Sequence, residues 1–167
     1  LCVARKKLSS ISAVTRPETM SDSNTEKLPI SKLSLIVQSG DVYQIHYAFA
    51  TASAALAINI PVTMFFTMAA SRAVMGTGDQ AGWRAMTTCA GQSGAEMDAG
   101  FSARNIGTME ELISACVALG ARFLICEMGL KALDLERDTL RPDLKFEVGG
   151  LVTFLSDAER DGQIIYI

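Results

Sequence analysis

Histidine and closely spaced cysteines are what this sequence most lacks. The 167 residues contain one histidine, His46, and four cysteines, without a CxxC motif or a Cys/His cluster. A structural zinc site needs about four ligands of these types at short spacings, so we expect no metal site. Walker, GxSxG and HExxH motifs are also missing, and Gly149-Gly150 matches too little of GxGxxG to indicate a dinucleotide. We therefore expect no cofactor.

Positive charge and aromatic residues are also scarce. The net charge is -3, and aromatic residues make up 7% of the chain. A nucleic-acid-binding protein usually carries a basic surface, and single-strand binders add aromatic side chains on which bases stack. Neither pattern is present, so we expect no nucleic-acid partner.

Charged residues are missing altogether between residues 42 and 71. A run of this length is long enough to span a bilayer. It is interrupted by Gln44, His46, Asn59 and Pro61, with an Ala-rich first half and a second half rich in Val, Thr and Phe. A buried helix followed by a buried strand explains this change better than one membrane helix. A membrane-associated protein remains an alternative.

The first residues differ in composition from the rest. They are basic and Ser-rich and lack hydrophobic periodicity. We predict that residues 1–28 form a disordered tail. Met20 is a possible natural start, and a targeting peptide is the rival interpretation. No apolar segment typical of a secretory signal follows Arg5, so we expect a cytoplasmic location with reduced thiols.

Apolar segments in the remainder alternate between strand and helix patterns. Strands are expected at 32–38, 62–67, 122–126 and 163–167, and helices at 42–58, 108–119, 130–135 and 151–159. Such alternation predicts an α/β fold, doubly wound, with a mainly parallel sheet of about five strands and helices on both faces. We expect residues 29–167 to form one domain.

Several residues predict where these elements begin and end. Asp41 is expected to cap the helix that starts near residue 42, and Thr108 with Glu111 forms a capping-box pattern. The Gly-rich stretch 72–107 between them is long for a connection in a compact domain. We expect one or two short helices and a mobile loop there.

Cys126 ends the apolar segment RFLIC and is followed directly by Glu127, Met128 and Gly129. The carboxyl ends of parallel strands form the edge at which α/β proteins bind ligands, and Gly40 and Asp41 are expected at the same edge. One interpretation is a buried core cysteine. The other is a partly exposed thiol whose anion is favoured by free backbone N–H groups in the following turn.

The remaining candidates have mainly structural interpretations. Cys116 lies on the apolar face of an expected helix and is typical of a core residue. Cys89 lies in the Gly-rich stretch, as a resolving thiol or a spectator, and Cys2 belongs to the tail. His46 is expected near the same sheet edge, as a proton carrier for Cys126 or as an ordinary helix histidine.

In four segments the sequence resembles the DsrE/DsrF-like sulfur-relay family, some members of which carry the label "predicted peroxiredoxin". The segments are KLSLIVQSGD, LISACVALGARFLICEMGLKAL, EVGGLVTFLSDA and GQIIYI, and the most specific part is the turn 126–129. The resemblance implies a doubly wound α/β domain that forms homo-oligomers, a trimer or a multiple of one. It also implies a sulfurtransferase-like carrier that holds sulfane sulfur as a persulfide on Cys126, between donor and acceptor proteins.

Two features depart from that pattern. No second cysteine lies beside Cys126, which disfavours an intramolecular disulfide cycle, and the stretch 72–107 is long. The Thr-x-x-Cys context of a peroxidatic cysteine is missing, so the peroxiredoxin label has no support. The competing hypothesis is a non-catalytic α/β protein that binds a small ligand beneath 72–107, or acts as a scaffold, while Cys126 stays inert.

Overall fold

A five-stranded parallel sheet organises the computed structural model, which describes residues 30–167. The predicted tail 1–28 and Met20 lie outside the described residues. The strand order is β4-β3-β2-β1-β5, with bounds β1 Leu33–Val37, β2 Val62–Phe66, β3 Arg122–Cys126, β4 Phe146–Gly149 and β5 Gln163–Tyr166. Every pairing between neighbouring strands is parallel. The predicted fold class is confirmed.

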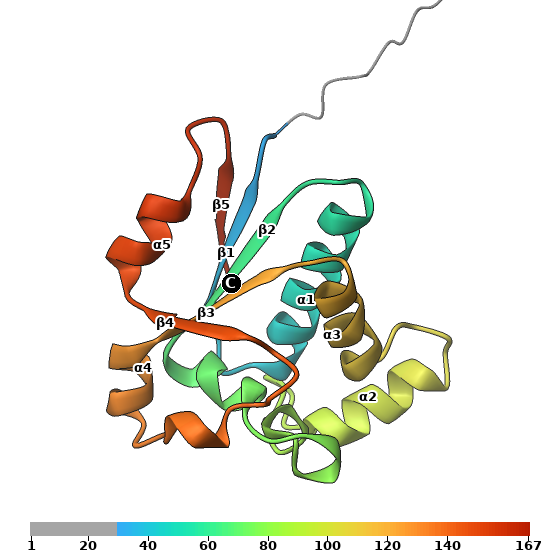
Figure 1. The fold of residues 1–167 in the computed structure, drawn as a ribbon. Helices are drawn as coiled ribbons and strands as arrows, with labels where there is room; N and C mark the ends of the chain where they lie inside the picture. Colours follow the sequence, from blue (N-terminus) through green and yellow to red (C-terminus); the bar gives the residue numbers. More distant parts are fainter. Residues whose placement is uncertain (1–29) are drawn as a thin grey trace, which may run out of the picture.

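Helices cover both faces of this sheet (Figure 1). Helix α1 (Val42–Ala57) and helix α3 (Met109–Ala118) pack together on one face, and α5 (Leu151–Asp157) lies on the other. Helix α4 (Glu127–Ala132) lies beyond the carboxyl end of β3. The chain runs outward from β1 to β4 and then returns through α5 to place β5 beside β1, which is doubly wound topology.

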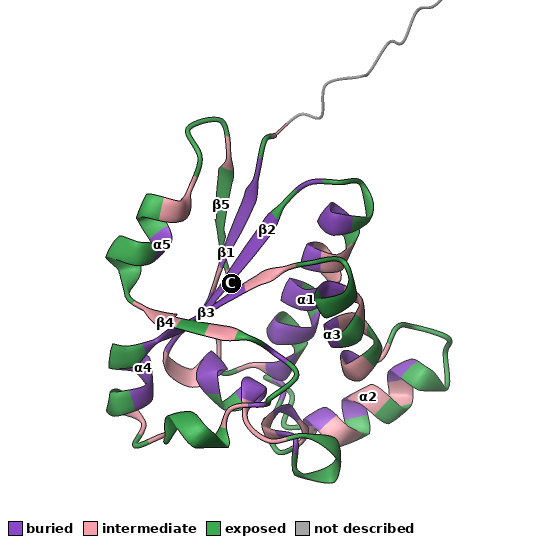
Figure 2. Cartoon of the chain, viewed as in Figure 1, coloured by how far each residue is buried: buried purple, intermediate pink, exposed green. Residues whose placement is uncertain are grey.

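Alternating side chains in the central strands build two hydrophobic cores. Leu35 and Met64 belong to the larger core beneath α1 and α3, whereas Phe65 and Leu124 join Phe154 of α5 in a smaller one. Because successive strand residues point to opposite faces, each of β1, β2 and β3 contributes to both cores. Figure 2 shows these strands as mainly buried, while α5 and β5 are mainly exposed.

The predicted helix starts are confirmed by side-chain caps. Asp41 accepts a hydrogen bond from the Tyr43 N–H at the start of α1, and Thr108 and Glu111 form the capping box of α3. The third predicted helix is corrected: it begins at Glu127, directly after β3, and not at residue 130. Strand β4 was not predicted, because FEVG has one charged residue among four and lies at the sheet edge.

The Gly-rich stretch contains one α-helix and several single turns. These are α2 (Gly94–Ser102) and the 3-10 helices η1 (Met68–Val74), η2 (Gly78–Gln80) and η3 (Gly82–Arg84), with a further turn, η4 (Arg137–Thr139), after α4. The expected short helices are therefore present. A Cβ atom on Gly82 would lie 1.9 Å from the Arg72 carbonyl oxygen, so only glycine lets η3 lie against η1. The uncharged run 42–71 divides into α1, β2 and part of η1, and no helix among residues 30–167 is long and apolar enough to cross a membrane.

A polar network joins α5 to the amino ends of three strands. Lys32 Nζ lies 2.6 Å from Asp157 Oδ2, the same oxygen accepts a hydrogen bond of 2.7 Å from Thr63, and Arg122 pairs with Asp157 Oδ1. Arg122 also pairs with Glu147 of β4. Burial alone would raise the pKa of Asp157, but the hydrogen bonds from Lys32 and Thr63 and the charges of Lys32 and Arg122 together lower it.

A second network holds the segment after α4 against α3. The buried Arg141 forms two hydrogen bonds with Glu110, of 2.9 and 2.7 Å, and pairs with Asp143. Glu110 also accepts a hydrogen bond of 2.8 Å from the indole N–H of the buried Trp83. The first network therefore fastens α5 to the sheet, and the second fastens the segment around Arg141 to α3 and Trp83.

Candidate functional site

Cys126 is the last residue of β3, between β2 and β4, and it lies opposite Gly149 in the parallel register. Its side chain faces α5, where it joins the smaller core with Phe65, Leu124 and Phe154. Only 2% of the residue is exposed, so the expectation of a partly exposed thiol is corrected. The cause is Phe154, which stacks on Phe65 with ring centroids 5.3 Å apart and covers this face of the sheet.

A cavity of about 370 Å³ nevertheless reaches Cys126. It lies between the end of β3 and the turn that joins β4 to α5, and its lining residues are Cys126, Glu127, Met128, Val148, Gly149, Gly150, Leu151 and Val152. Met128, Leu151 and Val152 are exposed. Cys126 is therefore a buried part of the wall of an apolar cavity that also has exposed hydrophobic residues in its wall.

The three residues after Cys126 have different surroundings. Glu127 forms an exposed ion pair with Lys131 at 2.8 Å, and Met128 projects toward solvent. Gly129 is buried, and a Cβ atom there would lie 2.6 Å from the Met68 backbone nitrogen and 3.1 Å from the Thr67 hydroxyl. The chain turns through glycine at this point because α4 touches the backbone that follows β2.

Asp41 and Gly40 lie at the carboxyl end of β1, as predicted, but they do not line the Cys126 cavity. Asp41 Oδ2 accepts a hydrogen bond of 2.9 Å from the Cys89 N–H, which fastens the loop after η3 to the start of α1. Gly40 lines a separate cavity of about 520 Å³. The loop after β1 and the end of β3 thus line two different cavities at the same edge of the sheet.

His46 lies away from Cys126. It is buried in α1, on the face of the sheet opposite α5, and its Nε2 lies 2.8 Å from the Gly107 carbonyl oxygen. Its ring packs on Phe101, with centroids 4.5 Å apart. These contacts join α1 to the segment between α2 and α3, and among the described residues they give His46 no contact with a thiol.

The larger cavity lies outside the carboxyl ends of β1 and β2. Its lining residues are Gly40, Ala69, Arg72, Gly82, Ala85, Met86, Thr87 and Leu133. The sequence predicted a pocket beneath 72–107, but it did not indicate which residues line it. A uniform Gly- and Ala-rich composition gave no signal to separate the cavity wall from the rest of the stretch.

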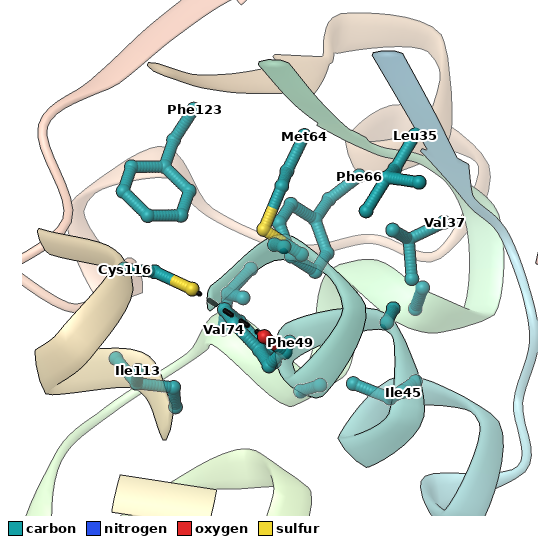
Figure 3. Packing of buried hydrophobic residues seen from close by; sticks show 14 of the residues in the cluster. Leu35, Val37, Ile45, Phe49, Met64, Phe66, Val74, Ile113, Cys116 and Phe123 are labelled. Atoms are coloured by element: carbon teal, nitrogen blue, oxygen red, sulfur yellow. Dashed lines mark hydrogen bonds between the residues drawn. The ribbon is translucent and has the colours of Figure 1, made fainter. Parts of the chain in front are cut away.

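Cys116 and Cys89 are opposite extremes of exposure. Cys116 is fully buried, and its Sγ donates a hydrogen bond of 3.5 Å to the Phe49 carbonyl oxygen (Figure 3). Cys89 is exposed. Among residues 30–167, no group of three or more His, Cys, Asp or Glu side chains is arranged to hold a metal ion.

Thiol labelling should separate these two cysteines. Burial raises the pKa of Cys116 to about 12, so almost none of it is thiolate at neutral pH. We expect iodoacetamide to modify Cys89 rapidly in the native protein and Cys116 only after unfolding in urea, as followed by mass spectrometry of peptides. Equal labelling rates in the native state would contradict the packing of α3 against α1.

Comparison with known proteins identifies the fold. No protein-family model matches the sequence, and a comparison with curated proteins found no match. Among solved structures, MTH1491 from Methanobacterium thermoautotrophicum, described as a protein of unknown function, superposes with a TM-score of 0.54 over 81% of this chain and 98% of its own, at 10% identity. The YchN protein of E. coli gives 0.48 at 14% identity, over 81% of this chain and 99% of its own.

This domain has the fold of MTH1491. At 10% identity the likeness extends to the arrangement of the strands and helices and not to the chemistry of the site.

Proposed function

We propose that this protein is a sulfur carrier that holds one sulfane sulfur as a persulfide on Cys126. The observation that supports this proposal best is the position of the thiol. Cys126 ends a central strand at the carboxyl edge of a parallel sheet, and a cavity of about 370 Å³ leads to it. A persulfide needs room for one additional sulfur atom beside Sγ, and protection from further oxidation. A buried cysteine in the wall of an apolar cavity fits both requirements.

The transfer itself needs no redox partner. The Cys126 thiol loses its proton and attacks the outer sulfur of a donor persulfide, R–S–SH. A new S–S bond forms at Cys126 as the donor's S–S bond breaks, and the donor leaves as a thiolate that takes up a proton. An acceptor thiolate then attacks the outer sulfur and releases Cys126 as a thiol. The number of S–S bonds is unchanged in each step.

The exposed side chains around the cavity fit a partner that delivers sulfur. Met128, Leu151 and Val152 border the cavity and present apolar surface to solvent. An exposed cluster of this kind favours contact with another protein. We propose that the donor and acceptor proteins dock there.

Sulfur loading tests the proposal. After incubation with cysteine persulfide, the wild-type protein should gain the mass of one sulfur atom on the peptide that contains Cys126. Cys126→Ser should abolish this gain, while Cys89→Ser, which removes an exposed thiol outside the cavity, should reduce it little. Persistent loading of Cys126→Ser would contradict the proposal.

One observation favours the alternative function. Because Cys126 is 2% exposed and packs among aromatic and aliphatic side chains, an inert core cysteine in a ligand-binding or scaffold protein has the same geometry. Native-state alkylation distinguishes the two functions. Modification of Cys126 by iodoacetamide in the folded protein supports the carrier, and resistance until unfolding supports the inert cysteine.

We also propose that the protein forms a homo-oligomer, as the family resemblance implies, with a trimer or a multiple of one favoured. Helix α5 and strand β5 present exposed apolar side chains, among them Leu155, Ile164 and Tyr166. Figure 2 shows α5 and β5 as mostly exposed. Exposed apolar side chains of this kind are typical of an interface between subunits.

Replacing Leu155 with Glu should therefore reduce the oligomer to monomers, because it places a charge in the proposed interface. Light scattering at micromolar concentration measures the change. Tyr47→Glu is the matched control, since Tyr47 is an exposed apolar residue on α1, on the opposite face of the sheet. A monomeric wild-type protein would contradict the proposal.

A further inference from the structure

The cavity of about 520 Å³ at the carboxyl ends of β1 and β2 has features of a ligand site that are independent of Cys126. It is formed by the loop after β1, by η1, and by the segment that follows η3. Cavities of this size hold small organic molecules, and open parallel sheets bind ligands outside the carboxyl ends of their strands. The proposed sulfur chemistry uses none of the residues that line it.

One cation lines this cavity. Arg72 belongs to η1 and is exposed to solvent, and among the described residues its guanidinium has no hydrogen bond and no ion pair. No Asp or Glu lines the cavity, and the nearby Asp41 is occupied by N–H donors from Tyr43 and Cys89. The cavity therefore carries one uncompensated positive charge.

The rest of the wall is small and apolar, apart from one hydroxyl. Gly40, Ala69 and Ala85 leave the space open, Met86 and Leu133 give it apolar sides, and Thr87 adds the hydroxyl group. The wall is also held in place. The Arg72 carbonyl accepts a hydrogen bond from the Met75 N–H and lies against Gly82, where a Cβ atom would come within 1.9 Å.

We propose that this cavity binds a small organic monocarboxylate with a compact apolar body. The planar guanidinium of Arg72 matches the two oxygens of a carboxylate, and the apolar wall accepts the remainder of the molecule. A phosphate dianion would need several donors for its oxygens, and the cavity offers one guanidinium and one hydroxyl. The ligand binds independently of whether Cys126 carries sulfur.

Benzoate is a suitable probe, with benzamide as its neutral counterpart. In ¹H–¹⁵N correlation spectra of the whole chain, benzoate should shift the amides of Gly40, Gly82 and Thr87. Benzamide should bind at least about tenfold more weakly than benzoate, because it lacks the charge that Arg72 recognises. Inorganic phosphate should also bind more weakly than benzoate, because it cannot use the apolar wall.

Two variants and their controls locate the site. Arg72→Gln should weaken benzoate binding about tenfold, while Arg160→Gln, the same change outside the cavity, should leave it unchanged. Ala85→Phe should block binding by filling the cavity, while Ala54→Phe on the exposed side of α1 should not. Cys126→Ser should also leave binding unchanged, so this test is separate from the sulfur-loading test.

The opposite results would overturn the proposal. The proposal fails if benzoate shifts no amides around the cavity, or if benzoate and benzamide bind with equal affinity. It also fails if the Arg72→Gln or Ala85→Phe protein binds benzoate as tightly as the wild type, or if phosphate binds as tightly as benzoate. The last result would indicate a site for a bare anion and not for a carboxylate with an apolar body.

Discussion

Replacing Asp157 with alanine should lower the free energy of unfolding by about 3 kcal/mol, the lower end of the range for breaking a buried ion pair. The substitution leaves the Lys32 ammonium, whose side chain is 11% exposed, without its partner, and it removes the acceptor for Thr63. Arg122 loses less, because its side chain is 37% exposed and it keeps Glu147. Denaturation in urea measures the loss, provided that the unfolding free energies of both proteins are fitted with the same dependence on urea concentration.

The effect of this substitution should depend on pH. The pKa of Asp157 in the folded protein lies below its ordinary value of 3.8, so its stabilising contribution is complete above that value. It is lost as the pH falls through the folded pKa, because the protonated group no longer pairs with Lys32. The difference in stability between wild type and Asp157→Ala should therefore stay constant from pH 7 to about pH 4 and shrink below it.

Glu159→Ala is the matched control, since it removes an exposed carboxylate two residues further along the chain. The free energy of unfolding of the Glu159→Ala protein should differ from that of the wild type by less than about 0.5 kcal/mol. Carboxylates present in both proteins contribute equally and cancel in the comparison. A loss for Asp157→Ala no larger than that of the control would show that the network does not hold α5 to the sheet.

Replacing Gly129 with alanine should cost about 2–3 kcal/mol, because the new methyl group meets backbone that cannot rotate away. The Cβ atom would lie 2.6 Å from the Met68 nitrogen, and Met68 is itself held at a φ of 47°. Helix α4 must then move away from η1, and Cys126, directly before α4, must move with it. We expect both lower stability and altered labelling of Cys126.

Gly107→Ala provides the comparison, because a Cβ atom there would meet only Leu112 at 3.5 Å, an ordinary contact. It keeps the carbonyl that accepts the bond from His46. This variant should unfold at nearly the wild-type urea concentration. If Gly129→Ala also unfolds at nearly the wild-type urea concentration, α4 does not pack against η1 as closely as the structure shows.

Local signals allowed most of the fold to be predicted from the sequence. The strands β1, β2 and β3 are short apolar runs bounded by Asp41, Pro61 or Gly120, and the caps of α1 and α3 are side-chain patterns that need no tertiary context. Strand β4 has no such pattern. Its pairing with β3 is decided by the partner strand and not by its own four residues.

The site was harder to predict, because it depends on contacts between distant segments. The position of Cys126 at a strand end followed from its own neighbours, but its burial follows from Phe154, which is 28 positions later (154 − 126). His46 was placed correctly on α1, yet its partner Gly107 lies 61 positions away. The pairing of Glu110 with Arg141 could not be predicted either, because the two residues are 31 positions apart and no sequence pattern links them.

The position of β5 beside β1 determines when the sheet can be completed during synthesis of the chain. Leu33 of β1 pairs with Gln163, 130 positions later, so one hydrogen-bonding edge of β1 stays open until almost the whole described chain has left the ribosome. An open edge of an apolar strand can pair with another chain. Newly made chains that stop before residue 163 should therefore aggregate more readily than chains that include β5.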